Sequence, residues 1–160
     1  MYAIASHSYL SHGTWQGNRT TSATPKLKMR DPFKSSVVIA INEIPIYGAT
    51  RKIRALQDWG ADWDGAGAVA VSAATIARAT VLVEEAYIAV SHIWSNPNVT
   101  ASPHGEVVLE WWNKEKKLTI YVSENQSDYV KVWGPDIDKE MDDGVLSDNQ
   151  IASLLVWLEM

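Results

Sequence analysis

The stretch that decides the fold is EVVLEWWNKEKKLTIYVSENQSDYVKVWG, residues 106–134. Within it, three runs rich in β-branched and aromatic residues, 106–112, 117–123 and 128–134, are separated by two polar links of four residues each, 113–116 and 124–127. Short polar links between β-type runs are typical of hairpins. The stretch therefore predicts a three-stranded antiparallel meander.

The predicted meander has two faces of different character, because side chains alternate across a strand. One face is expected to pack on a helix and collects Val107, Leu109, Trp111, Leu118, Ile120, Val122, Val130 and Val132. The opposite face collects Val108, Glu110, Trp112, Thr119, Tyr121, Tyr129, Lys131 and Trp133. The second face is more aromatic than a merely solvated sheet surface requires.

Two interpretations of this aromatic face compete. In one, cross-strand aromatic pairs stabilise the sheet by about 0.2–1 kcal/mol each, or the N-terminal arm or last helix covers the rings. In the other, the face binds a protein partner or a second copy, since Trp and Tyr supply large anchoring area. Direct nucleic-acid stacking is disfavoured because few basic residues surround the rings. The candidate partner-binding residues are Trp112, Tyr121, Tyr129, Lys131 and Trp133.

Helical periodicity precedes the meander in two places. Apolar residues repeat at helical spacing from Ala49 to Trp59, which predicts a short amphipathic helix. Ser72 is a suitable N-cap for a long helix that Asn96-Pro97 ends. Apolar side chains and alanines occupy several faces of this long helix, so we expect it to be covered on more than one side.

A last helix follows the meander. Ser147 with Gln150 three residues later is the pattern of a capping box, and it predicts a helix over about 148–158. Together these elements predict an α+β fold: an antiparallel meander of three to four strands packed against a long buried helix, with a short preceding helix and a C-terminal helix.

The two ends of the chain differ in composition. Residues 1–36 are rich in Ser, Thr, Gly and Asn without an apolar period, which predicts a flexible or draped arm. Residues 37–160 are expected to form a single domain, and the apolar run 37–41 at its start predicts a short strand.

Charge and composition bound the function classes. The 160 residues carry a net charge of −5 and no cysteine, which excludes disulfides and thiolate chemistry. Residues 1–34 are basic and residues 135–144 are acidic. In one interpretation both segments are simply solvated. In the other, the basic arm folds back on acidic surface or reaches toward a partner. Neither a signal peptide nor a membrane span is predicted, so we expect a cytoplasmic protein.

A tryptophan-rich turn lies before the long helix, in the segment WDGAGA at residues 63–68. Trp63 can plug the core, the Asp64 carboxylate can accept backbone N–H bonds, and Gly65 and Gly67 allow positive φ. The spacing of the nearby carboxylates, and of the acidic residues in 136–143, does not match a calcium loop. We therefore predict a structural turn, with neither metal nor cofactor.

The motifs LQDWGADWDGAGA (56–68) and GEVVLEW (105–111), with Ser72 opening a long helix between them, resemble a group of small bacterial and phage proteins that share a Trp-Asp-Gly turn. The resemblance covers about residues 49–133 and implies a fold rather than an activity. The chain departs from the pattern at 69–71, Val-Ala-Val, where a proline is usual.

These observations favour a non-catalytic protein-binding module. The resemblance, size and acidic charge extend this to a phage- or mobile-element-encoded inhibitor of a host nucleoprotein defence complex (anti-CRISPR-like), or an antitoxin-like partner. The alternatives are a small metal-independent hydrolase that uses His104 and nearby carboxylates such as Glu106, and a structural homodimer.

Overall fold

The computed structural model describes residues 45–160. The predicted arm (1–36) and the predicted strand at 37–41 lie outside these residues. In chain order the elements are α2 (Tyr47–Ala55), η1 (Leu56–Asp58), α3 (Ala73–Val90), η2 (Ser91–Ile93), β1 (Asn98–Ala101), β2 (Val107–Asn113), β3 (Lys116–Val122), β4 (Ser127–Val132), β5 (Met141–Val145) and α4 (Gln150–Glu159).

The strands form one antiparallel sheet in the order β1-β2-β3-β4-β5, so every strand pairs with its neighbour in the chain. The α+β class and the central meander are confirmed, but the sheet has five strands rather than three or four. The additional strands are β1 and β5, at the two edges.

Strand β5 corrects the interpretation of 135–144 as a solvated loop. Its sequence, MDDGV, contains residues that are depleted in strands. Its pairing with β4 is extended at both ends, because the Trp133 N–H donates to the Glu140 carbonyl (2.9 Å) and the Leu146 N–H to the Ser127 carbonyl (2.8 Å). The extended conformation of β5 therefore depends on its pairing with β4 rather than on the β-propensity of its own residues.

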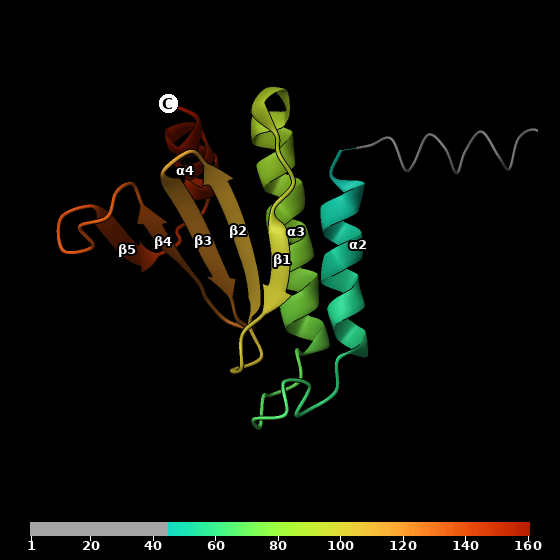
Figure 1. Cartoon of the computed structure of the whole chain (residues 1–160). Coiled ribbons are helices and arrows are strands. Elements are labelled where there is room, and N and C mark those ends of the chain that lie inside the picture. The colour runs from blue at the N-terminus through green and yellow to red at the C-terminus, as the bar shows by residue number, and fades with distance from the viewer. Residues whose placement is uncertain (1–44) are drawn as a thin grey trace, which may run out of the picture. The chain divides into compact units, whose positions relative to one another are not determined.

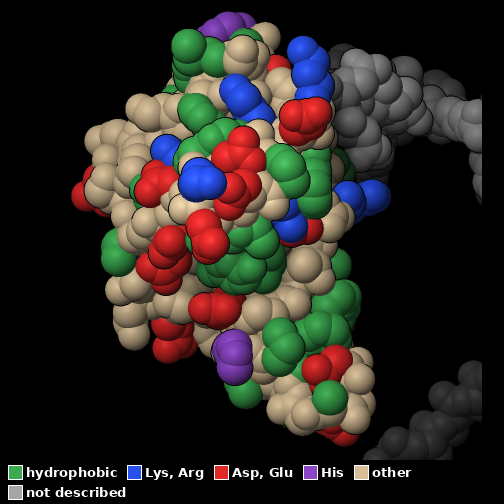
Figure 2. Space-filling view, turned by 60° about the vertical axis from the view of Figure 1, so that its left-hand side comes forward, with side chains coloured by type: hydrophobic (Ala, Val, Ile, Leu, Met, Phe, Trp, Pro, Cys, Tyr) green, Lys and Arg blue, Asp and Glu red, His purple; other side chains and the backbone are tan. Residues whose placement is uncertain are grey.

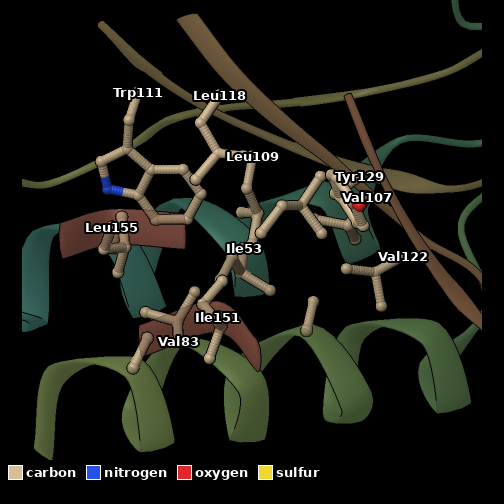
Figure 3. Close-up of a cluster of buried hydrophobic side chains, with 14 of the residues drawn as sticks. Ile53, Val83, Val107, Leu109, Trp111, Leu118, Val122, Tyr129, Ile151 and Leu155 are labelled. Carbon is tan, nitrogen blue, oxygen red and sulfur yellow. The ribbon is translucent and has the colours of Figure 1, made fainter. Parts of the chain in front are cut away.

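In Figure 1, α3 and α4 lie behind the sheet and cover one of its faces, and α2 lies beside α3 and β1. Figure 3 shows the core between these layers, where Ile53 from α2, Val83 from α3 and Ile151 from α4 point toward Leu109 and its neighbours on the sheet. We call the helix-covered side the inner face. On β2 and β3 the predicted inward residues are confirmed as buried: Val107, Leu109, Trp111, Leu118, Ile120 and Val122.

Helix α3 begins as predicted, with the Ser72 hydroxyl oxygen accepting a hydrogen bond from the Thr75 N–H at 3.1 Å. Its buried side chains form one stripe rather than several. Ile88 is 78% exposed and Val81 is also exposed, so the expectation of cover on more than one side is wrong for this part of the helix. Alanines let the inner stripe approach the sheet without requiring a second cover.

Helix α4 also matches its prediction, but its N-terminal cap is only half of a capping box. The Gln150 side chain accepts a hydrogen bond from the Ser147 N–H at 3.0 Å, as the box requires. The Ser147 hydroxyl binds the same oxygen instead of a backbone N–H of the helix. Asn149, in the left-handed conformation with φ 64°, redirects the chain at this point.

Candidate functional site

The candidate site is the face of the sheet that the helices leave uncovered, which we call the outer face. Cross-strand pairing assigns its members, because directly paired residues share a face. They are Asn98, Thr100, Val108, Glu110, Trp112, Lys117, Thr119, Tyr121, Asp128, Val130, Val132, Met141, Asp143 and Val145.

Trp112 is the most prominent aromatic residue of the outer face, with 63% of its surface exposed. It is paired across the β2–β3 ladder with Lys117, whose Nζ lies 4.6 Å from the centroid of the indole ring. The same ammonium forms an ion pair with the Glu110 carboxylate. A cation over the ring and a carboxylate on the cation hold the indole in place on a rigid strand.

The remainder of the outer face combines covered and accessible positions. Val108 and Thr119, in the middle strands, are buried although they point outward. Toward the β5 edge, Val132 pairs with Met141, and Val145 is 62% exposed. The row of outer-face residues that starts at Trp112 therefore passes through Lys117 before it reaches Val132 and Met141. In Figure 2, which brings the β4–β5 side forward, hydrophobic side chains lie among acidic and basic ones, with acidic ones more numerous.

The outer face differs from the predicted one on β4. Val122 pairs with Ser127 and Ile120 with Tyr129, so the odd-numbered residues of β4 share the inner face. The predicted inward positions, Val130 and Val132, point outward instead. Three of the candidate partner-binding residues are consequently not on the outer face: Tyr129, Lys131 and Trp133.

The larger apolar area of the aromatic side chains explains this register. Tyr129 and Trp133 bury more surface than two valines would, and each keeps a polar group for a hydrogen bond. Tyr129 belongs to the core, and its hydroxyl lies 3.3 Å from the Asp142 carboxylate. Trp133 packs edge-to-face on Trp157 of α4, with ring centroids 6.1 Å apart. The alternation of apolar residues predicts the valines inside, whereas packing against α4 favours the rings.

A lysine lies among these inner rings. The Lys131 Nζ is 5.6 Å from the centroid of Trp157 and 5.9 Å from that of Trp133. It forms an ion pair with Asp142 of β5 at 2.8 Å. The hydrogen bond from Lys131, assisted by its charge and by the Tyr129 hydroxyl, lowers the pKa of the Asp142 carboxyl, against a smaller opposing effect of desolvation. This pair fastens β5 to β4.

We expect Asp142→Asn to remove part of the pH dependence of stability. A carboxyl whose pKa is lowered by folding stabilises the protein above its ordinary pKa of about 3.9, and this stabilisation is lost as pH falls through the folded-state pKa. Because the pair is partly exposed, its contribution is below about 1 kcal/mol. Urea unfolding at pH 7 and pH 3 measures it. An identical pH dependence in both proteins would show that the pair contributes nothing.

The Trp-Asp-Gly turn is a self-contained network of backbone hydrogen bonds. Asp64 Oδ1 accepts hydrogen bonds from the N–H groups of Ala66 (2.8 Å) and Ala68 (3.1 Å). These two bonds, the one from Ala66 more strongly, lower the pKa of the Asp64 carboxyl. Gly65 and Gly67 have φ values of 71° and 92°, which favour glycine. Trp63 is half-buried beside the core, its ring centroid 4.8 Å from that of Trp59.

The turn is attached to the hairpin between β1 and β2. The Val69 N–H donates to the Pro103 carbonyl at 2.9 Å. Gly105, at φ +80°, lies so close that a Cβ there would be 3.1 Å from the Ala70 carbonyl oxygen. The segment that directly follows the Trp-Asp-Gly turn therefore contacts the hairpin between β1 and β2 through its backbone.

His104 and Glu106 lie in this same hairpin, beside a hollow of about 270 Å³. The Glu106 carboxylate accepts a hydrogen bond from the Ser102 hydroxyl at 2.8 Å, and the Ser102 oxygen accepts from the His104 N–H. Among residues 45–160, no hydrogen bond joins the His104 imidazole to a carboxylate. The observed network shapes the hairpin and does not orient a general base.

Two further acidic side chains are used locally. Asp62 Oδ1 accepts the Gly67 N–H at 2.8 Å, and Asp136 pairs with Lys139 at 2.9 Å. Within the described part of the chain, no three His, Asp or Glu side chains gather in an arrangement that could hold a metal ion. None of the helices between residues 45 and 160 has the length and apolar character to cross a membrane.

Sequence reasoning identified Trp112 and Tyr121 and overlooked the apolar residues of β5. Met141 and Val145 join the outer face only because β5 pairs with β4, so their sole sequence signal is the alternation Met-Asp-Asp-Gly-Val.

Comparison of the chain with protein-family models, with curated proteins and with solved structures found no match.

Proposed function

We propose that this protein is a non-catalytic binding module that docks a protein partner on the outer face of its sheet. The observation that carries the proposal is the exposed and preorganised indole of Trp112. A large aromatic ring held on a strand by a cation and a carboxylate loses little conformational entropy on binding, which is the property of an interface anchor.

The surroundings of the ring support a protein partner over nucleic acid. Its nearest cation, Lys117, is already neutralised by Glu110. Val132 and Met141, which lie beyond Lys117 on the same row, are apolar, and the chain as a whole carries a net charge of −5. Binding of a nucleic acid would require unpaired basic residues around the ring to contact the phosphates. Binding of a basic or neutral protein surface does not require them.

The finer form of the proposal is an inhibitor or antitoxin-like protein of phage or mobile-element origin, directed at a host nucleoprotein defence complex. Its support is the resemblance of the two turn and strand motifs, together with small size and acidic charge. A cytoplasmic location belongs to the same proposal.

The test is affinity capture from a host lysate with wild-type protein and the Trp112→Ala variant, followed by calorimetry on the captured partner. Loss of an interface anchor costs about 2 kcal/mol or more, so we expect binding to weaken about 30-fold or more. Circular dichroism should be unchanged, because the ring is 63% exposed and not part of the core.

Trp59→Ala is the matched control. Trp59 is also an exposed tryptophan, but it lies beside the Trp-Asp-Gly turn rather than on the outer face. Equal capture by wild type and Trp112→Ala would contradict the proposal. Light scattering of the purified protein distinguishes the homodimer alternative, which predicts a dimer that Trp112→Ala dissociates.

A further inference from the structure

We propose that the open edge of β5 binds an extended, lysine- or arginine-rich segment of a partner protein as a sixth strand of the sheet. The inference rests on the proposed binding function but uses a different surface, the backbone of an edge strand. Strand addition of this kind gains affinity from main-chain hydrogen bonds and specificity from side-chain contacts.

The hydrogen bonds of β5 define which of its groups are available. In an antiparallel ladder, hydrogen-bonded and non-hydrogen-bonded pairs alternate. The Trp133 N–H donates to the Glu140 carbonyl and the Leu146 N–H to the Ser127 carbonyl, so 140 and 146 belong to hydrogen-bonded pairs. The backbone N–H and carbonyl groups of the even-numbered residues from 140 to 146 therefore point toward β4. The N–H and carbonyl groups of Met141, Asp143 and Val145 therefore point away from the sheet.

These outward groups lie at an open edge. Within residues 45–160, no backbone hydrogen bond reaches Met141, Asp143 or Val145 from a further strand, and β5 pairs only with β4. Figure 1 shows β5 at the edge of the sheet with no other labelled element beyond it, whereas α2 packs beside β1 at the opposite edge. A strand added at β5 would continue the outer face.

The side chains beside this edge specify the chemistry of the occupant. Met141, Asp143 and Val145, which carry the outward backbone groups, have their side chains on the outer face, where Val145 is 62% exposed. Asp143 is also exposed, and Asp138 and Asp148 lie exposed on either side of the strand. An incoming strand thus meets two apolar side chains around a carboxylate, in an acidic setting. Because residues two apart in a strand share a face, the complementary strand carries an apolar, a basic and an apolar side chain at positions i, i+2 and i+4.

The same charges disfavour a second copy of this chain. The most extensive symmetric pairing of two β5 strands would place Asp143 opposite Asp143 and Met141 opposite Val145. Like charges directly opposite each other destabilise an antiparallel pair. Charges at an edge are also a common protection against self-association, so the edge discriminates between its own copies and a basic strand.

The experiment uses the full chain and a synthetic seven-residue peptide, Lys-Val-Lys-Lys-Lys-Val-Lys, followed by amide hydrogen exchange in NMR. The second, fourth and sixth residues of this Lys-Val peptide share one face, which therefore reads Val, Lys, Val. In the free protein, we expect the amides of Asp142, Gly144 and Leu146 to exchange slowly and those of Met141, Asp143 and Val145 to exchange fast. With millimolar peptide, the second group should slow at least tenfold while the first group is unchanged.

Two control peptides separate strand pairing from charge attraction. One replaces each Lys by Glu, and the other places Pro at the central Lys, which removes the ability to pair as a strand. Both should leave exchange within twofold of the free protein. Equal protection by the Pro-containing peptide, or none by the Lys-Val peptide at millimolar concentration, overturns the proposal.

Variants of the edge give an independent readout. Val145→Pro removes one outward N–H without breaking the ladder to β4, and we expect at least tenfold weaker peptide binding than with Val145→Ala. Asp143→Asn retains the N–H and removes the charge, so it should weaken binding severalfold and reduce its salt dependence. Equal binding by Val145→Pro and Val145→Ala overturns the proposal. If Val145→Pro fails to fold, the even–odd protection pattern of the wild type still decides.

The failure of this inference is distinguishable from failure of the proposed function. Trp112→Ala leaves the edge of β5 intact, so it should bind the Lys-Val peptide as the wild type does. Peptide binding without capture of a lysate partner would retain the edge site and remove the role of the indole. Capture of a lysate partner without binding of the peptide would support the role of the indole and contradict strand addition at β5.

Discussion

Trp111→Ala is expected to lower the free energy of unfolding by about 3–5 kcal/mol, the range for truncating a buried aromatic side chain. The Trp111 ring is 2% exposed and lies in the core shown in Figure 3. Its Nε1–H donates to the Ser95 carbonyl at 2.9 Å, and its ring packs edge-to-face on Trp94 at 6.4 Å between centroids. Truncation leaves a cavity and also removes the partner of that carbonyl.

The adjacent tryptophan provides a matched control, because consecutive residues of a strand point to opposite faces. Trp112→Ala removes the same side chain from the same strand, and we expect a change within about 1 kcal/mol, consistent with its exposure. Urea unfolding of the two variants, monitored by circular dichroism, measures the difference. Equal destabilisation by the two substitutions would mean that the faces of β2 are assigned wrongly.

Ile53→Ala is expected to cost about 2–5 kcal/mol of stability. Ile53 is fully buried, and it reaches from α2 into the centre of the core, toward Leu109 and α4. Because α2 is short and has no acidic residue in its first turn, its stability depends on this burial rather than on helix propensity. The substitution therefore tests whether α2 is an integral layer of the fold.

The next residue of α2 supplies the control for this substitution. Arg54 is exposed, so Arg54→Ala should change stability by no more than about 0.5 kcal/mol. The measurement is the shift in the midpoint of urea unfolding at constant slope. An Ile53→Ala protein as stable as Arg54→Ala would show that α2 contributes little to the core.

The sequence predicted best where local pattern and tertiary contact agree. On β2 and β3 every second residue is apolar without a break, and each strand packs under helices, so the inward set was correct. On β4 the alternation is ambiguous, because Tyr129 and Trp133 compete with Val130 and Val132 for the inner face. Only the pairing of Val122 with Ser127 resolves this choice. A shift of one residue moves every side chain to the other face.

The edge strands could not be predicted from their own residues. Asn98–Ala101 has four residues, and Met141–Val145 contains a glycine and two aspartates. Their conformation depends on partners elsewhere in the chain, which hydropathy does not encode. For the candidate site, the sequence placed Trp112 and Tyr121 on the outer face, and it missed Met141 and Val145 for the same reason.

The order of the strands has a consequence for how the chain reaches this structure. Because each strand pairs with the one before it, the sheet forms by successive local hairpins, and each closure fixes a short loop at small entropic cost. Folds dominated by such short-range contacts cross their transition state rapidly. Within residues 45–160, the docking of α2, α3 and α4 onto the strands joins more distant segments, so the meander supplies the surface on which the helices complete folding.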